Sequence, residues 1–195
     1  MPEYGDALTL REAREQYFRD NGFGEEGYAA RWVRMQAGPL RFSFPNTAAR
    51  VRAVRLHDLH HALTGYDTTW TGEAEIAAWE IASGCAAHFA AWQLNLIAMA
   101  IGLVIAPRAV HRAFVRGRHS GNLYRSEFGE HLLKPTVGDM RRRLRLDAAS
   151  PAATAADNAA FALWSTAAVV GVVATSAILL VPIALLLGPA ARLIF

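Results

Sequence analysis

The chain has no charged residue between Asp157 and Arg192. About 20 apolar residues are enough to cross a bilayer as a helix, so residues 158–191 are predicted to form one C-terminal transmembrane helix, with a kink at Pro182. A tight hairpin of two short halves and a buried core helix are the alternatives. Arg141, Arg142, Arg143 and Arg145 precede the segment and only Arg192 follows it. Because basic flanks stay in the cytoplasm, the main domain is expected to face the cytoplasm.

The rest of the chain is predicted to be an all-α helical bundle, residues 1–146, joined to the membrane segment by the small-residue linker 147–157. Helix signals recur along it: a capping box from Thr9 to Glu12, caps at Asn46 and at Thr69 or Thr71, the uncharged stretch Ala86–Ala106, and TVGDMRRRLRL. We expect Ala86–Ala106 to be a buried helix rather than a span. Residues 22–45 mix aromatic residues with Gly and Pro, so they are predicted to be irregular or to hold one short helix near Ala29–Gln36, and no strand is expected.

Between Leu56 and Pro107 the chain carries carboxylates but no lysine or arginine: Asp58, Asp67, Glu73, Glu75 and Glu80. Such a run needs a counter-charge, and a bound cation would supply one. Solvated helix faces are the alternative.

The stretch HDLHHALTGYDTTWTGE, from His57 to Glu73, concentrates residues that bind metals. At about 100° per residue from Val51, His57, His61 and Asp58 fall at about 240°, 280° and 340°, in one sector of a helix, and His60 falls outside it at about 180°. Histidines four residues apart can share one divalent cation. Asp58 can add an oxygen, and Glu73 can fold back from the next helix to close the set.

Nitrogen and oxygen ligands from His57, Asp58, His61 and Glu73 suit Zn, Mn or Fe(II), with an open position of the catalytic kind. Ordinary polar residues on a solvated helix remain an alternative. The zincin motif H-E-x-x-H shares the histidine spacing, although Asp58 is one methylene shorter than its glutamate base. An HD-type phosphohydrolase also uses a histidine upstream of its His-Asp doublet, and every histidine here lies at position 57 or later.

These residues resemble the coenzyme Q (ubiquinone) biosynthesis protein Coq-four family, whose signature is H-D-x-x-H followed by eleven residues and a glutamate. His57, Asp58, His61 and Glu73 fit it without a gap. The LTG after the second histidine, the TT before the GE, the later Glu80 and the GRHSGNLYRSEFGE region also resemble the family. The resemblance covers roughly residues 9–146.

The resemblance implies an all-helical, membrane-associated protein in which these four residues hold a metal, zinc before Mn or Fe. It implies a metal-dependent enzyme of quinone biosynthesis that removes the ring carboxyl of a prenylated hydroxybenzoate-type precursor by oxidative decarboxylation and works beside the other enzymes of that pathway. A non-catalytic scaffold that binds prenyl lipid and organises those enzymes is the alternative, and a zincin-like zinc hydrolase is the second. The sequence departs from the family in two ways. No mitochondrial presequence is recognised, so a bacterial-type inner membrane is expected, and the apolar tail is unlike the known members, which attach to membranes peripherally.

Other residues are assigned supporting roles, and no general acid or base is assigned. Glu80 and His60 are expected to orient the metal ligands by hydrogen bonds, although Glu80 could instead pair with an arginine and His60 could lie at the surface. Leu96, Ala100 and Leu103 are expected to line a path for the prenyl chain. The basic residues 108–125 fit anionic lipid headgroups, whereas nucleic acid is not expected because no recognised module accompanies the charge. A homodimer is left open.

Overall fold

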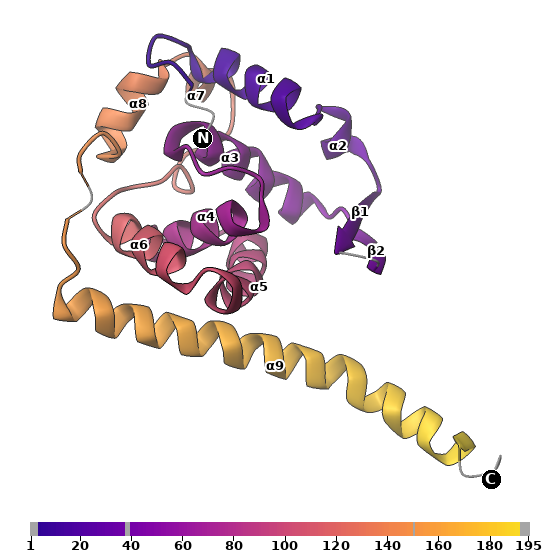
Figure 1. Ribbon diagram of the computed structural model, residues 1–195. Coiled ribbons are helices and arrows are strands. Elements are labelled where there is room, and N and C mark those ends of the chain that lie inside the picture. Colours follow the sequence, from indigo (N-terminus) through magenta and orange to yellow (C-terminus); the bar gives the residue numbers. More distant parts are fainter. Residues whose placement is uncertain (1–3, 38–39, 150, 192–195) are drawn as a thin grey trace.

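Helices make up most of the chain that the computed structural model describes, which comprises residues 4–37, 40–149 and 151–191. Arg192, used above in the charge comparison, lies outside these residues. The helices are α1 (Leu10–Asn21), α2 (Glu26–Ala29), α3 (Ala48–Thr64), α4 (Trp70–Ser83), α5 (Phe89–Ile105), α6 (Pro107–Arg118), α7 (Glu130–Leu133), α8 (Val137–Leu144) and α9 (Ala155–Ala191) (Figure 1). The expectation of a mainly helical protein is therefore confirmed.

Side-chain caps set where the main helices begin. Thr9 and Glu12 form the expected capping box of α1, and α1 ends at Gly22 in the left-handed conformation, with φ of 65°. Thr69 caps α4. The cap predicted at Asn46 is wrong by one residue, because Thr47 caps α3. The amide of Asn46 instead donates to backbone carbonyl oxygens of the α2 region, so this residue fixes the incoming loop.

A β-hairpin corrects the expectation that the domain holds no strand. Strands β1 (Trp32–Ala37) and β2 (Leu40–Pro45) are antiparallel, with Trp32 opposite Pro45 and Ala37 opposite Leu40. The short helix expected near Ala29–Gln36 is also wrong, because α2 ends at Ala29 and the chain is extended from Ala30 onward. Both strand sequences alternate aromatic or aliphatic residues with polar ones, which suits a strand. The neighbouring glycine and prolines obscured this alternation.

Helix α4 lies at the centre of the domain and packs against α5 and α6, with α3 beside it (Figure 1). Trp79 of α4 is fully buried, and its indole N–H donates to Ser120 at 2.9 Å. Leu56, Leu59 and Leu63 of α3 are buried, on the face that the helical spacing predicted for the core. The domain therefore buries the C-terminal half of α3 on all sides and nearly all of α4 around a single core.

Close approach of α4 and α6 depends on Gly117. A methyl group added at this glycine would meet the carbonyl oxygen of Trp79 and the side chain of Ala82. The absence of a side chain at position 117 therefore lets the two helices approach at backbone distance, which holds α4 firmly in the core.

Helix α9 is fixed to the domain at its start. Asp157 accepts from Arg118 Nε at 2.7 Å and lies 3.2 Å from His119 Nε2, both at the end of α6. Further along, the rings of Trp164 and Trp92 of α5 stack with centroids 5.2 Å apart. The first half of α9 therefore packs on the domain, and Figure 1 shows its second half extending beyond it.

The structure supports a single C-terminal helix and not the hairpin alternative. Helix α9 runs without a break through position 182, where a kink was expected. Its stretch Ala155–Ala174 is long and apolar enough to cross a membrane, judged by length and composition. The helix begins at Ala155, so the predicted linker of residues 147–157 overlaps its first turn.

We expect Gly117→Ala to lower the free energy of unfolding by about 1–3 kcal/mol, because the added methyl must push α6 away from Trp79. The measurement is urea unfolding of the full chain in detergent micelles, followed by circular dichroism. Gly27→Ala is the matched control, because a methyl there meets no atom within 4 Å. An unchanged unfolding midpoint for Gly117→Ala would show that α4 and α6 do not need this close approach.

Candidate metal centre

Two histidines of α3 and one glutamate of α4 form a compact group. His57, His61 and Glu73 each place one ligand atom within 4.8 Å of the others. His57 Nε2 and His61 Nε2 are 3.1 Å apart. Glu73 lies across from both rings, with Oε2 at 3.4 Å from His57 Nε2 and Oε1 at 3.5 Å from His61 Nε2. These three residues could therefore hold one metal ion, as the histidine spacing and the following glutamate predicted.

The turn between α3 and α4 brings Glu73 to the histidines. Gly65 ends α3 with φ of 77°, and Asp67 Oδ1 accepts from the backbone N–H of Thr69 at 3.0 Å. A side chain at Gly72 would meet the backbone carbonyl of Asp67, so glycine lets the first turn of α4 lie directly against this turn. Glu73 is the next residue, in the first turn of α4. Local turn chemistry thus places its carboxylate opposite the end of α3.

Hydrogen bonds fix which nitrogen of His61 carries a proton. His61 Nδ1 lies 2.9 Å from the carbonyl oxygen of Tyr66, which can only accept. Nδ1 therefore bears the proton and donates it, which leaves a lone pair on Nε2. That lone pair lies on the side of His57 and Glu73, where a cation would bind.

His57 is oriented in the same way by a buried carboxylate. Its Nδ1 donates to Glu80 Oε1 at 2.9 Å. Burial alone would raise the pKa of Glu80, but His57 and His60 hold it well below its usual range, so the carboxylate is ionised. The Nε2 of His57 is thus left for a ligand on the side of His61.

The 3.1 Å separation of the two Nε2 atoms requires something between them. Two lone pairs at that distance repel, and a proton or a cation removes the repulsion. Burial lowers the pKa of His57, but Glu80 and Glu73 raise it more, so the net pKa lies well above its usual value. Without metal, the proton on His57 Nε2 therefore serves this purpose. A metal ion would take its place.

Glu80 also joins the site to the rest of the core. It is fully buried, and its second oxygen accepts from Asn95 of α5 at 2.5 Å and from the hydroxyl of Tyr124 at 2.7 Å. His60 Nδ1 donates to Glu80 Oε1 at 2.6 Å, while His60 Nε2 accepts the backbone N–H of Leu123 at 2.9 Å. His60 is buried and not at the surface. Glu80 thus contacts the predicted metal ligand His57 directly, and His60 is connected to His57 through Glu80.

Asp58, the fourth predicted ligand, lies outside the three-residue group. Its side chain is buried and accepts the hydroxyl of Tyr28, and burial raises the pKa of its carboxyl. Its role as a ligand stays a prediction. The contact with Tyr28 joins this buried carboxylate to α2.

The group is partly open to solvent, and aromatic rings pack on its buried member His61. The exposed fractions of the side chains are 37% for Glu73, 19% for His57 and 1% for His61. Tyr17 stacks on His61, with ring centroids 5.3 Å apart, and the half-exposed Phe23 packs against Tyr17. Three protein ligands with an accessible side are typical of catalytic metal sites, which keep a position for water or substrate.

Several residues of this region were not found from the sequence. Tyr17, Tyr28 and Tyr124 come from distant segments, and no spacing links them to the motif. Asn95 could have been found from the sequence, because it is a polar residue within an uncharged stretch. The residues assigned to a lipid path, Leu96, Ala100 and Leu103, are half-buried and pack against the core. That assignment stays a prediction.

Comparison with known protein families, with curated proteins and with solved structures found no match for this chain.

Zinc binding is expected to release about one proton per metal near pH 7, because the cation displaces the proton of His57 Nε2. Below the raised pKa of His57 the affinity should fall by about tenfold per pH unit. Calorimetric titration of the full chain in two buffers of different ionisation enthalpy measures the proton count. Binding without proton release would contradict the arrangement described here.

Glu80→Gln is expected to weaken zinc binding by about 10–100-fold, because His57 loses the ionised partner that orients its ring. The dissociation constant is measured by competition with a chromophoric chelator. Glu75→Gln changes a carboxyl on the same helix outside the hydrogen-bonded network and should leave the affinity unchanged. Equal affinities for the two variants, both folded by circular dichroism, would show that Glu80 does not support the metal ligands.

Proposed function

We propose that this chain is a membrane-bound, metal-dependent enzyme of quinone biosynthesis that removes the ring carboxyl of a prenylated hydroxybenzoate-type precursor. The observation that carries the proposal is the group of His57, His61 and Glu73, whose Nε2 and carboxylate atoms converge on one point. The H-D-x-x-H-x₁₁-E spacing and its resemblance to the Coq-four family support the choice of pathway. The apolar helix α9 supports a substrate that resides in the bilayer.

The donor set fits a divalent cation. His57 and His61 would bind as neutral imidazoles, and Glu73 would contribute the single negative charge. Burial would raise the pKa of Glu73, but its contacts with His57 and His61 outweigh burial and lower that pKa, so its carboxylate is ionised and can bind a cation. Zinc, manganese or iron(II) suits such a set, and when bound it supplies a Lewis acid for a carboxylate or phenolate oxygen.

The protein residues would bind and orient the aromatic acid. A divalent cation held by one carboxylate and two neutral imidazoles would keep an open coordination position that an anionic ring carboxylate can take. The half-exposed ring of Phe23 packs against Tyr17, which stacks on His61, and would offer an apolar surface to the substrate ring. The tautomers of both histidines are fixed beforehand by Tyr66 and Glu80, so no ligand has to reorient when substrate binds.

The reaction replaces the carboxyl group by a hydroxyl group. The bond from the ring to the carboxyl carbon breaks, carbon dioxide leaves, and a new carbon–oxygen bond forms on the ring. This exchange is a two-electron oxidation of the aromatic acid. It therefore requires an external two-electron acceptor, and we assign dioxygen to this role: water supplies the oxygen of the new hydroxyl, and dioxygen is reduced to hydrogen peroxide.

The contacts of Asp58 argue against the zincin-like alternative. That mechanism needs the carboxylate after the first histidine to act as general base on a metal-bound water. The Asp58 carboxylate instead accepts the hydroxyl of Tyr28 and is buried. The scaffold alternative assigns no role to Asp58, so only the activity assay distinguishes the scaffold from the enzyme.

The proposal is tested by turnover. Purified full chain, loaded with each of the three metals in turn, is incubated in air with a prenylated 4-hydroxybenzoate bearing an isotopic label in its carboxyl. We expect labelled carbon dioxide and the hydroxylated ring from the native chain and from Glu75→Gln, and neither product from Glu73→Gln. A folded, metal-loaded chain that releases no label with any of the three metals would contradict the enzyme and favour the scaffold.

A further inference from the structure

Helix α5 exposes an apolar stripe while its opposite face lies in the core. Met99, Ala91, Gly102 and Asn95 are buried. Apart from Gln93, the exposed residues of α5 are large and apolar: Phe89, Leu94, Ile97, Ile101, Val104 and Ile105. We call these six residues the α5 stripe. The exposed fractions of Ile97 and Val104 are 44% and 83%, which is substantial for aliphatic side chains.

The spacing of the α5 stripe makes it one continuous surface. Leu94, Ile97, Ile101, Val104 and Ile105 follow one another at intervals of three or four residues or are adjacent, so they line one face of the helix. A helix on the surface of a water-soluble domain normally presents polar residues at these positions. Helix α5 contains no charged residue at all. The α5 stripe therefore requires an apolar partner.

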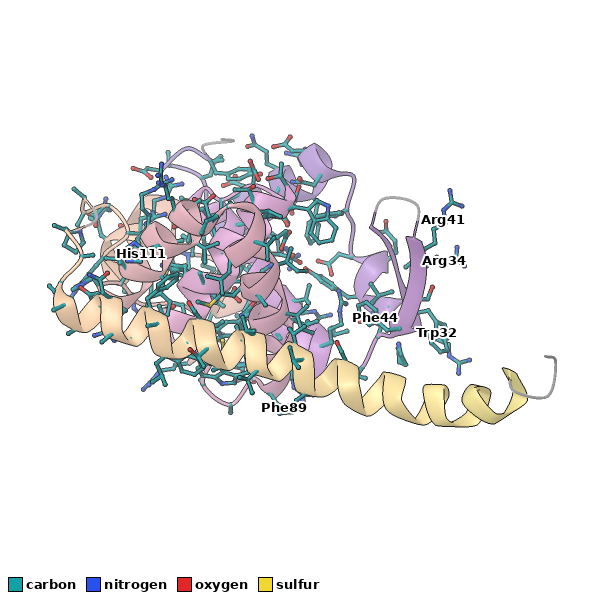
Figure 2. The ribbon with its side chains drawn as sticks, turned by 60° about the horizontal axis from the view of Figure 1, so that its bottom comes forward. Trp32, Arg34, Arg41, Phe44, Phe89 and His111 are labelled. Atoms are coloured by element: carbon teal, nitrogen blue, oxygen red, sulfur yellow. The ribbon has the colours of Figure 1, made fainter. Side chains whose placement is uncertain are left out.

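Helix α9 borders the α5 stripe and has the same property. It packs along α5, with Trp164 stacked on Trp92, and its outer face exposes Leu163, Val170 and Val173. Figure 2 shows α9 lying across this side of the domain, with Phe89 beside it. Two unpartnered apolar surfaces thus meet at the α5–α9 contact. One of them belongs to the helix that can cross a membrane.

The length of α9 shows how the two surfaces can share one bilayer. Its 37 residues extend about 55 Å, whereas the hydrocarbon core is about 30 Å thick. The stretch Ala155–Ala174, which is long and apolar enough to cross a membrane, is the part of α9 that packs along α5, so α9 can enter the bilayer with the α5 stripe beside it. Asp157 holds the start of α9 against Arg118 and His119, so the domain keeps a fixed position next to the helix.

We propose that the α5 stripe and the outer face of the first half of α9 form a docking surface for the lipid bilayer. The domain then lies on the membrane through α5, in addition to being anchored by α9. Apolar helix faces of this kind bury themselves at the boundary between headgroups and acyl chains. Arg108, exposed just after α5, suits the anionic headgroups at that boundary. The proposal goes beyond the proposed function and does not depend on a bound metal.

The docking surface would bring the metal centre close to the lipid. Asn95, on the face of α5 opposite the stripe, donates directly to Glu80, which in turn accepts from His57. Only the thickness of α5 and this hydrogen-bonded pair separates the α5 stripe from the nearest metal ligand. A substrate with a long apolar chain could therefore stay partly in the bilayer while its polar ring reaches the centre.

The test measures how deeply α5 lies in lipid. Single nitroxide labels are attached to Ile97→Cys, Ile101→Cys and Glu15→Cys in the full chain, reconstituted at one chain per lipid nanodisc. Cys85 is fully buried, so it should not take up label, and the unsubstituted chain checks this. Glu15 is an exposed residue of α1 and serves as the control, because helix α1 lies on the side of the domain away from α9 (Figure 1).

We expect labels at positions 97 and 101 to collide several-fold more with oxygen than with a water-soluble nickel chelate, and the label at position 15 to show the reverse. Equal chelate accessibility at all three positions would overturn the proposal. A second outcome would also overturn the proposal: the chelate reaches the α5 stripe in discs that hold one chain, and the nitroxide signals broaden when two chains share a disc. That outcome would assign the surface to a second copy of the chain. Circular dichroism of each labelled chain shows that the helices are retained.

Discussion

The buried carboxylate of Glu80 is the interaction on which the domain and the metal centre both depend. An ionised group in a protein interior is costly unless hydrogen bonds replace its water. Glu80 receives four of them, from His57, His60, Asn95 and Tyr124. These partners come from α3, from α5 and from the loop after α6. The bonds therefore fix three neighbouring segments around α4 and orient a metal ligand at the same time.

The same network explains how the centre is prepared for a cation. His57 and His61 each give their Nδ1 proton to an acceptor, Glu80 or the carbonyl of Tyr66. Both Nε2 atoms are thereby placed 3.1 Å apart beside Glu73. A metal ion meets a site whose geometry the fold has already set. Little conformational entropy then has to be lost on binding, which favours affinity.

Local sequence signals were enough to predict the parts of the structure that depend on short distances along the chain. Thr9 with Glu12, Gly65, and the four-residue spacing of His57 and His61 each act within one or two helical turns, so the pattern is read directly. The contacts of Glu80 with Asn95 and Tyr124 join residues 15 and 44 positions apart. No periodicity in the sequence predicts contacts between residues so far apart along the chain. The hairpin was missed because glycine and proline near its turn hid an alternation of only six residues per strand.

In the apolar segments, tertiary contacts decide which faces of a helix are buried. The sequence predicted an uncharged C-terminal helix and a buried α5, and α9 has the length expected of a membrane helix. Helix α5 is buried only on the face that holds Asn95 and Met99. Composition alone does not distinguish a helix surrounded by protein from one that leaves half of its surface exposed. The contacts of α5 with the core and with α9 show which of its faces stays exposed.

The central claim is that His57, His61 and Glu73 bind one divalent metal. Elemental analysis of the purified full chain by mass spectrometry, alongside His61→Ala, Glu73→Ala and the control Glu75→Ala, tests it most directly. The account predicts about one equivalent of metal in the native chain and in Glu75→Ala, and its loss from the other two variants, all with native circular dichroism. A folded native chain that takes up no zinc, manganese or iron, or metal retained in full by both ligand variants, would contradict it.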